Sequence, residues 1–326
     1  MKLNKIKKIL IASALALTIG LSAACSACGV QTKRPRAKIT FEFNSVEYSL
    51  EYDLYRNMYP NTVRHFIELA KAGYYNDMIV HDYSSGEWVT GAYSYTAEYA
   101  GATGDGGTMS EYFANNSKAA DYIKLFSEGK FTPSVYGNTD YKTDKDGNFV
   151  YENSTPVRVI NKDYALPTVI GEFKKNISQS IKNGALSATS GSLKMIYYPA
   201  SGSDNASKNK VFVTPTSDQL LNADFKYNSA TSVFAMQMGS STYGADEYCV
   251  FGKVRNTDAM DKLKKAVSDY FEDTYGDETY TINAETNVPV YEPTSDGKSY
   301  NTKTVEINFK VPKTVIKVIS VKITKN

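Results

Sequence analysis

Strict alternation of apolar and polar residues near both ends of the chain constrains its fold more than any other sequence feature. Residues 38–43 and 46–52 follow this period of two and are separated by Asn44-Ser45. Such alternation is typical of strands with one buried face, so the two stretches predict a hairpin. Residues 305–311 alternate in the same way, and 319–323 predict a last strand near the end of the chain.

Two segments have helical spacing of apolar residues instead. The first begins at Pro60, with Asn61 as the expected N-cap and Gly73 as the stop signal. The second is expected to be capped by Asp258 and places four apolar residues on one face, namely Met260, Leu263, Val267 and Tyr270. Each predicted helix therefore has one face that needs to be buried against a sheet or a barrel end.

Predicted strands outnumber predicted helices along the chain. Further buried strands are expected at 191–196 and 231–236. Strands and helices do not alternate, which argues against a doubly wound parallel sheet. The chain is therefore expected to be mainly β, as a barrel or a sandwich. Its 326 residues suffice for one large domain or two ordinary ones.

Residues 1–24 have the organisation of an export signal. Four early lysines precede an apolar run at 9–21, which is too short to cross a bilayer as a helix. Small residues then lead into Cys25, and this order resembles a bacterial lipoprotein signal. We expect Cys25 to be lipidated, with Cys28 as the second candidate and plain secretion as the alternative. Residues 25–36 then form a tether, and the folded domain is 37–326.

Composition excludes several functional classes. Removing residues 1–24 removes four lysines and no acidic residue, so the net charge changes from +2 to −2 over 302 residues. No nucleic-acid partner is expected from such a balance. The two histidines and three cysteines have no metal-ligand spacing, so no metal and no cofactor are expected. Cys249 lies in an apolar stretch and is expected to be a buried, unreactive thiol.

Two loop-like motifs are weak on inspection. The glycine-rich residues 101–107 are not followed by the Lys-Ser/Thr pair of a phosphate-binding loop. Asp144 to Gly147 is similar to part of a calcium loop, but Lys142 and Asn153 occupy the positions of its first and last acidic ligands. A hairpin turn at Asp146-Gly147 is the better interpretation.

The order of several short motifs resembles the cyclophilin family of peptidyl-prolyl isomerases. These motifs are Pro60-Asn61-Thr62-Val63 with its Gly73-Tyr74-Tyr75 exit, Ile79-Val80-His81, Gly171-Glu172-Phe173, Gly191-Ser192-Leu193-Lys194-Met195 and Val250-Phe251-Gly252-Lys253-Val254. The resemblance covers about 36–107 and 168–326. It implies a closed antiparallel β-barrel capped by two helices. Residues 108–168, which are polar and weakly periodic, are expected to be a loop insertion outside that barrel, and about 273–312 to be an added strand pair.

The resemblance also implies a catalytic chemistry. Amide resonance gives X–Pro rotation a barrier of roughly 18–20 kcal/mol. In cyclophilins an arginine after the histidine of a Phe-His-Arg motif donates a hydrogen bond to the twisted prolyl nitrogen. This chain has Asp82 after His81, and a carboxylate cannot donate. Glu87 and Thr90 replace a phenylalanine and a glutamine of the family motif.

The remaining candidates for a proline pocket are mostly aromatic. They are His81, Trp88, Phe234, Tyr243 and Tyr248. Each has an alternative interpretation as a structural residue. Another arginine could supply the missing donor, and the candidates in the folded domain are Arg56, Arg64, Arg158 and Arg255.

Three functions follow as hypotheses. The first is a cyclophilin-like isomerase that acts on exported proteins at the outer face of a bacterial membrane, with activity weakened or lost at Asp82. The second is a non-catalytic lipoprotein that uses the same barrel to bind polypeptides, including proline-containing segments of cell-envelope proteins. The third, a solute-binding lipoprotein, is disfavoured by the absence of a βαβ pattern.

Overall fold

One antiparallel sheet dominates the structure. The computed structural model describes residues 32–132, 168–172, 186–198, 229–240, 249–293 and 300–326, and short stretches between 134 and 166. Within this part, ten strands form the sheet, in the order β3-β18-β1-β2-β15-β13-β14-β5-β4, with β12 also paired to β14. Their bounds are β1 Arg36–Phe43, β2 Val46–Leu54, β3 Met78–Ile79, β4 Asp82–Tyr83, β5 Glu87–Thr90, β12 Val169–Ile170, β13 Ser192–Tyr198, β14 Ser229–Gln237, β15 Cys249–Val254 and β18 Ile316–Lys325.

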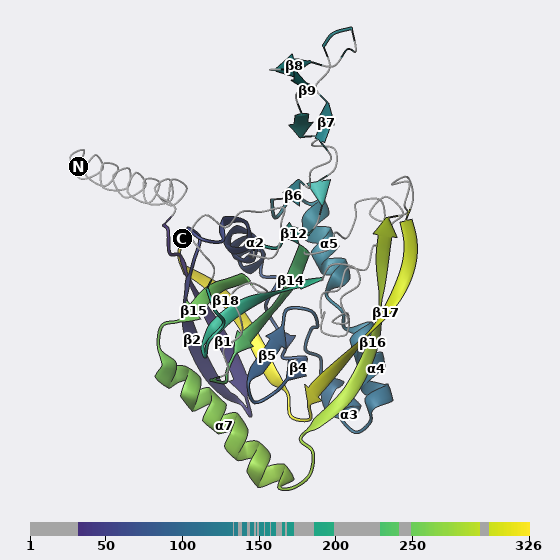
Figure 1. The fold of residues 1–326 in the computed structure, drawn as a ribbon. Helices are drawn as coiled ribbons and strands as arrows, with labels where there is room; N and C mark the ends of the chain where they lie inside the picture. The colour runs from purple at the N-terminus through teal and green to yellow at the C-terminus, as the bar shows by residue number, and fades with distance from the viewer. Residues whose placement is uncertain are drawn as a thin grey trace, which may run out of the picture.

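The sheet is strongly curled (Figure 1). The two strands at the ends of its order, β3 and β4, are consecutive in the chain and are separated by only Val80 and His81. The Val80 N–H donates to the Ile316 carbonyl at 2.9 Å, and the His81 N–H donates to the Val89 carbonyl at 3.0 Å. This segment therefore bonds to β18 on one side and to β5 on the other. The mainly β, antiparallel character expected from the sequence is confirmed.

The first hairpin forms as predicted. β1 and β2 pair in regular register from Arg36↔Asp53 to Phe43↔Val46. Asn44 and Ser45 both have positive φ, 50° and 65°, as a two-residue hairpin turn requires. The strands predicted near 191–196, 231–236, 305–311 and 319–323 are also present, as β13, β14, β17 and β18.

The concave face of the sheet encloses an aromatic core. Phe66 lies at its centre, with ring centroids 5.2 Å from Tyr75, 5.4 Å from Phe234 and 5.1 Å from Phe251. Edge-to-face and offset pairs of this kind contribute about 0.5–1.5 kcal/mol each beyond the burial of their area. The core is therefore held by specific ring geometry as well as by apolar area.

Helix α2, Pro60–Lys71, covers this core with its predicted face, including Val63, Phe66 and Ile67. The prediction that Asn61 caps it is wrong. Tyr59 occupies the N-cap position without a side-chain hydrogen bond. The free N–H groups of the first turn are bound instead by the distant carboxylate of Glu172, so a charge complementary to the helix dipole replaces a local cap.

Helix α7, Thr257–Tyr275, lies at the opposite end of the sheet from α2 in Figure 1. Its buried face carries Met260, Leu263 and Val267 as predicted, but Phe271 is buried where Tyr270 was expected, and Tyr270 is only partly buried. The predicted cap is also wrong. Asn256 is the N-cap, and its side chain accepts from the Asp258 N–H at 3.0 Å.

The strand pair expected within 273–312 is present. β16, Thr281–Pro293, pairs with β17, Tyr300–Pro312, in unbroken antiparallel register. Three further helices lie between β5 and β6 in the chain, α3 Tyr99–Ala102, α4 Gly106–Asn115 and α5 Ala119–Ser127. α4 lies alongside β16 in Figure 1, and the Glu285 N–H donates to the Ser110 hydroxyl at 3.1 Å.

Residues 108–131 differ from the polar loop that the sequence predicted. Met109 and Phe113 of α4 are fully buried, and Tyr122 and Ile123 of α5 are buried. The weak periodicity concealed these helices because each is only nine or ten residues long, with three buried positions.

The short strands that follow are β6 Ser134–Val135, β7 Thr139–Tyr141, β8 Tyr151–Glu152, β9 Thr155–Pro156, β10 Arg158–Ile160 and β11 Ala165–Leu166. Figure 1 shows β7, β8 and β9 projecting from the sheet.

Candidate functional site

Asp82, at the expected arginine position, is bound to the added strand pair. It lies in β4, and its Oδ1 accepts a hydrogen bond from the Lys310 N–H of β17 at 2.8 Å. The two partners are 228 residues apart in the sequence, so no local pattern indicates this contact. The carboxylate acts as an acceptor for backbone of the same chain.

His81 lies beneath the same strand. Its side chain is fully buried, and its ring centroid is 5.0 Å from that of Tyr93 and 5.2 Å from that of Phe309 on β17. Both contacts are edge-to-face. The imidazole is therefore enclosed by protein rather than presented to a ligand.

These contacts belong to a second apolar cluster on the outer face of the sheet. Strands β3, β5, β13 and β14 contribute one side, and α3, α4, β16 and β17 contribute the other. The buried members are Ile79, Val89, Ala92, Tyr93, Tyr99, Ala102, Met109, Tyr112, Phe113, Ala119, Ile196, Val233, Ala235, Ala284, Ile307, Phe309 and Val311. The outer face beside Asp82 and His81 is thus covered by the chain itself.

Trp88 and Phe234 face the opposite way, into the inner core. Trp88 is 1% exposed and lies 6.2 Å from Phe41 and 5.6 Å from Tyr83, measured between ring centroids. Phe234 is fully buried against Phe66. The structure therefore does not place Phe234 with His81 in one pocket. Tyr243, Tyr248 and Cys25 lie outside the described residues.

A buried polar cluster occupies the same outer face, at the far end of β5. Lys194 of β13 is 2% exposed and forms an ion pair with Glu87 of β5. Gln237 of β14 is opposite Glu87 in the ladder and is fully buried, and its side-chain amide has no hydrogen-bond partner among the described residues. Thr90, the other departure from the family motif, donates to the Ile79 carbonyl at 2.7 Å. Sequence analysis had singled out Glu87 and Thr90 but not Lys194, because its partner is 107 residues away.

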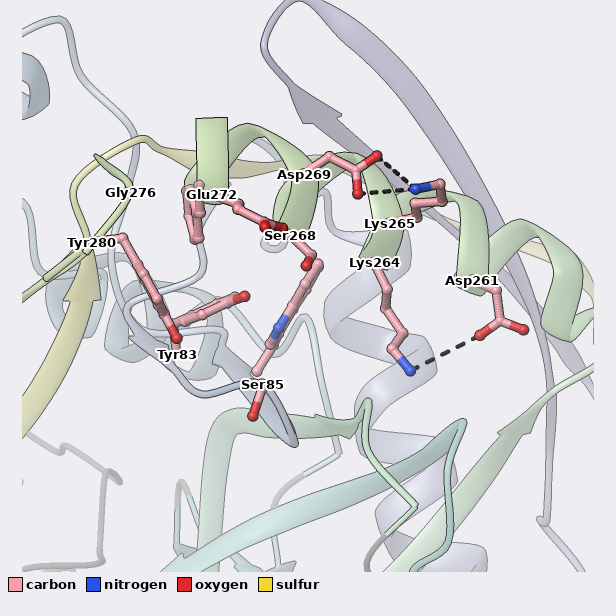
Figure 2. Close-up of a pocket in the computed structure, with 12 residues that line it drawn as sticks. Tyr83, Ser85, Asp261, Lys264, Lys265, Ser268, Asp269, Glu272, Gly276 and Tyr280 are labelled. Atoms are coloured by element: carbon pink, nitrogen blue, oxygen red, sulfur yellow. Dashed lines mark hydrogen bonds and ion pairs between the residues drawn. The ribbon is translucent and has the colours of Figure 1, made fainter. Parts of the chain in front are cut away.

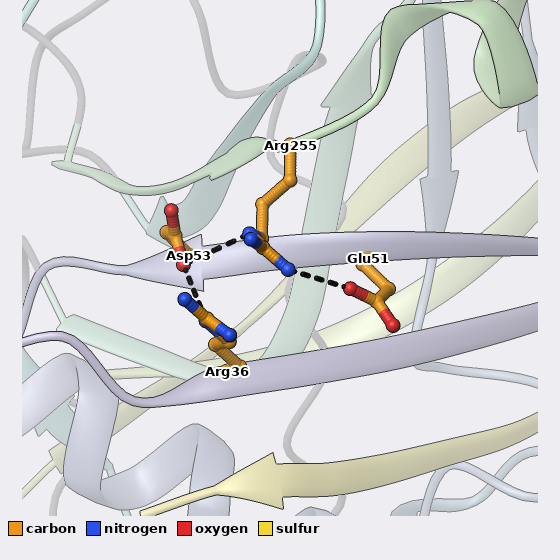
Figure 3. Close-up of polar contacts among 4 residues, drawn as sticks. All are labelled: Arg36, Glu51, Asp53 and Arg255. Atoms are coloured by element: carbon orange, nitrogen blue, oxygen red, sulfur yellow. Dashed lines mark hydrogen bonds and ion pairs between the residues drawn. The ribbon is translucent and has the colours of Figure 1, made fainter.

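Three of the four candidate substitute arginines are engaged elsewhere. Arg255 donates to Glu51 at 2.8 Å and lies 3.5 Å from Asp53, which Arg36 also contacts at 3.1 Å (Figure 3). Arg64 donates to the Asn61 side chain at 3.2 Å. Arg56 binds the Thr32 carbonyl and the Asn326 side chain, and the Arg158 side chain lies outside the described part.

Several buried titratable groups hold α2 in place. Glu172 accepts from the Thr62 N–H at 2.8 Å and from the Asn61 N–H at 3.2 Å, and burial raises the pKa of its carboxyl. Burial lowers the pKa of His65 to about 4, and its Nε2 lies 3.0 Å from the Thr231 carbonyl. Cys249 is buried as predicted, and burial raises the pKa of its thiol well above the usual range. These groups stabilise the fold and are not exposed to a substrate.

Comparison with known families agrees with the resemblance. A family model described as cyclophilin type peptidyl-prolyl cis-trans isomerase/CLD matches residues 38–284. The chain belongs to this family. No curated protein matches the chain. Among solved structures, two crystal structures of a Cryptosporidium parvum cyclophilin-type isomerase align with it, one of them in the presence of the dipeptide Ala-Pro. They are 13% and 14% identical, with TM-scores of 0.37 and 0.35, and the alignments cover 90% and 89% of this chain and 99% of each of theirs.

Family membership makes the local chemistry at Asp82 informative. Prolyl isomerisation in this family needs a donor aimed at the prolyl nitrogen, because only the twisted state accepts that hydrogen bond. In this chain the carboxylate of Asp82 is an acceptor that is already bound to the Lys310 N–H. The described residues contain no group of three His, Cys, Asp or Glu side chains arranged to hold a metal ion. No helix among the described residues is long and apolar enough to span a membrane.

A pocket of about 580 Å³ opens at a different place, between α7 and the β4–β5 turn (Figure 2). Its aromatic lining is Tyr83, Trp88, Phe271 and Tyr280, and its polar lining includes Ser85, Ser268 and Glu272. Trp88 is the one member that sequence analysis had proposed for a pocket. The other members could not be found from sequence, because the lining comes from two distant segments, 83–88 and 261–280, that only the fold brings together.

Proposed function

We propose that this chain is a polypeptide-binding member of the cyclophilin family with little or no prolyl isomerase activity. The observation that carries the proposal is the hydrogen bond from the Lys310 N–H to Asp82 Oδ1 at 2.8 Å. It ties β17 across the position from which a family member would donate to substrate. The second hypothesis from the sequence is thereby favoured over the first.

One further contact and one electrostatic argument support the loss of catalysis. His81, beside Asp82, is fully buried under Phe309. A carboxylate next to a prolyl nitrogen would also repel the lone pair that develops there in the twisted state. The negative charge of Asp82 and the burial of His81 both oppose catalysis of prolyl isomerisation at this position.

The proposed setting is the outer face of a bacterial membrane. The basic start, the 13-residue apolar run and the small residues before Cys25 support export and lipidation. An acyl chain contributes roughly 0.8 kcal/mol per buried methylene to membrane attachment. Exported or cell-envelope polypeptides are the partners that such an anchored protein would meet.

We also propose that the sheet is closed, as in the family barrel, with α2 and α7 at its ends. The bonding of residues 78–83 to both β18 and β5 supports closure. Closure would leave the outer face beside Asp82 as a surface distinct from the interior, and β16–β17 would then be an addition to the outside of the barrel.

A paired binding and catalysis experiment tests the proposed function. The first measurement is fluorescence anisotropy of a labelled, permanently unfolded polypeptide titrated with the chain from residue 26 onward. The second is a protease-free isomerisation assay with the same preparation. Saturable binding with a rate near the uncatalysed one supports the proposal. Isomerisation at a rate typical of the family, or no binding of the polypeptide, contradicts it.

A further inference from the structure

The pocket between α7 and the β4–β5 turn has the chemistry of a site for a cationic side chain. We propose that it binds an arginine or lysine side chain of a polypeptide partner, an assignment that rests on the proposed binding function. It lies beside the inner core, whereas Asp82 faces β17 on the outer face of the sheet.

The wall is built from four aromatic rings in contact. Tyr280 stacks on Phe271 at 4.9 Å with an angle of 20° between the ring planes, and its centroid is 5.9 Å from that of Tyr83. Trp88 lies 5.6 Å from Tyr83. Tyr280 is 37% exposed, unlike the other three rings, so it offers an open ring to a ligand. A cation over such a ring gains about 0.5–1 kcal/mol when exposed and about 2 kcal/mol or more when desolvated.

The pocket is lined by more carboxylates than lysines. Lys265 is paired with Asp269 at 2.8 Å, and Lys264 lies 3.9 Å from Asp261. Glu272 also lines the pocket, and Lys265 interacts with it electrostatically as well as with Asp269. Figure 2 shows Glu272 and Ser268 on the α7 side, across from Tyr83 and Tyr280. Three carboxylates and two lysines line the pocket, so its net charge is −1.

The end of α7 adds to this negative potential. The last turn carries no basic residue, and a helix C-terminus bears a partial negative charge of about half an electron. The ammonium group of Lys313 lies 5.3 Å from the centroid of Tyr275 and does not line the pocket. A cation entering between Tyr280 and Glu272 would meet an aromatic face, a carboxylate and the helix terminus together.

The volume and shape suit a side chain attached to a polypeptide. A pocket of about 580 Å³ falls within the range of about 300–1,000 Å³ that is usual for ligand sites. The aliphatic part of arginine or lysine can pack along the rings while its charged end reaches the carboxylate. A purely apolar side chain would use the rings but leave the net negative charge of the pocket unbalanced.

Trp88 supplies a specific readout, because it is the single tryptophan of the 326-residue chain and it lines the pocket. The probe is the blocked pentapeptide Ala-Gly-Arg-Gly-Ala, titrated while Trp88 emission is recorded. Its citrulline counterpart has nearly the same shape without the charge. We expect a saturable change in Trp88 emission with the arginine peptide, and an affinity that falls as the salt concentration is raised. The citrulline peptide should bind at least fivefold more weakly.

Four variants test the residues. Tyr280→Phe should bind as the wild type does, because it keeps the ring, whereas Tyr280→Ala should bind at least fivefold more weakly. Glu272→Gln should weaken binding about two- to fivefold. Glu128→Gln, an equal change of charge at the exposed C-cap of α5, is the matched control and should have no effect. Circular dichroism of each variant confirms that it is folded.

The proposal is overturned if Trp88 emission does not respond to the arginine peptide, if the citrulline peptide binds equally well, or if Glu128→Gln weakens binding as much as Glu272→Gln. This failure is distinguishable from failure of the proposed function. A chain that binds unfolded polypeptide without catalysing isomerisation, but gives no Trp88 response, would retain the function and lose this site.

Discussion

The carboxylate of Asp82 and the backbone N–H of Lys310, 2.8 Å apart, connect β4 to β17 across 228 residues of sequence. This contact fixes the added strand β17 beside Asp82. In the function proposed above, Asp82 supplies no catalytic donor and β17 covers the position where a donor would act. One residue would then account for both the chemical and the steric departure from the family.

Replacing Asp82 should loosen β17 before it affects the rest of the fold. Asp82→Ala removes the acceptor of the Lys310 N–H, so we expect faster hydrogen exchange at that amide and a loss of about 1 kcal/mol in the free energy of unfolding. Asp277→Ala, at an exposed carboxylate after α7, is the control. Unchanged exchange at Lys310 in Asp82→Ala would show that the contact does not hold β17.

Stability should rise with pH between about 4 and 6.5. Burial lowers the pKa of His65 to about 4, against an unfolded value of about 6.5. The unfolded chain therefore binds more protons in this window, and the stability contributed by neutral His65 is lost as pH falls through it. The full effect is about 3 kcal/mol as an order of magnitude.

The pH prediction is measured by urea unfolding at pH 4.5, 5.5 and 6.5 in wild type and in His65→Gln. Comparing the two removes contributions from other groups, such as Glu172, whose raised pKa gives a slope of opposite sign. A steeper rise in the wild type is expected. Equal slopes in the two proteins would contradict the assignment to His65.

Phe113 of α4 should behave as a core residue. It is fully buried, with ring centroids 4.4 Å from Tyr93 and 5.1 Å from Phe309. Phe113→Ala is therefore expected to lower the free energy of unfolding by about 3–5 kcal/mol. Tyr151→Ala, at an exposed aromatic in β8, should change it by less than about 0.5 kcal/mol. A small loss for Phe113→Ala would indicate that α4 is peripheral after all.

The sequence was most informative where structure is local. The hairpin at Asn44-Ser45 was predictable because alternation and turn residues act over a few positions. Both major helices were predictable from spacing, but their caps were not. Glu172 supplies the acceptor for α2 from 110 residues away, and no local pattern indicates such a partner.

In the candidate site, too, features set by local sequence were predictable and features set by distant contacts were not. Asp82 was identifiable because it follows His81 in a short motif. Its partner Lys310, the covering of His81 by Phe309 and the pairing of Lys194 with Glu87 all depend on tertiary contacts between distant segments. Phe234 was assigned to a pocket from its motif, yet it points into the inner core, because the two faces of a strand differ by a single residue of register.

The central claim is that Asp82 and its contact with β17 leave this chain without effective prolyl isomerase activity. The most direct measurement is kcat/KM in a protease-free isomerisation assay on an X–Pro peptide, for wild type, Asp82→Ala and Asp82→Arg beside a cyclophilin that keeps the arginine. Loss of one preorganised donor costs about 2.7–4 kcal/mol, so we predict a wild-type value at least about a hundredfold below the reference. Asp82→Arg should recover only a small part, because Glu87, Thr90 and β17 remain. A wild-type value within tenfold of the reference would contradict the account.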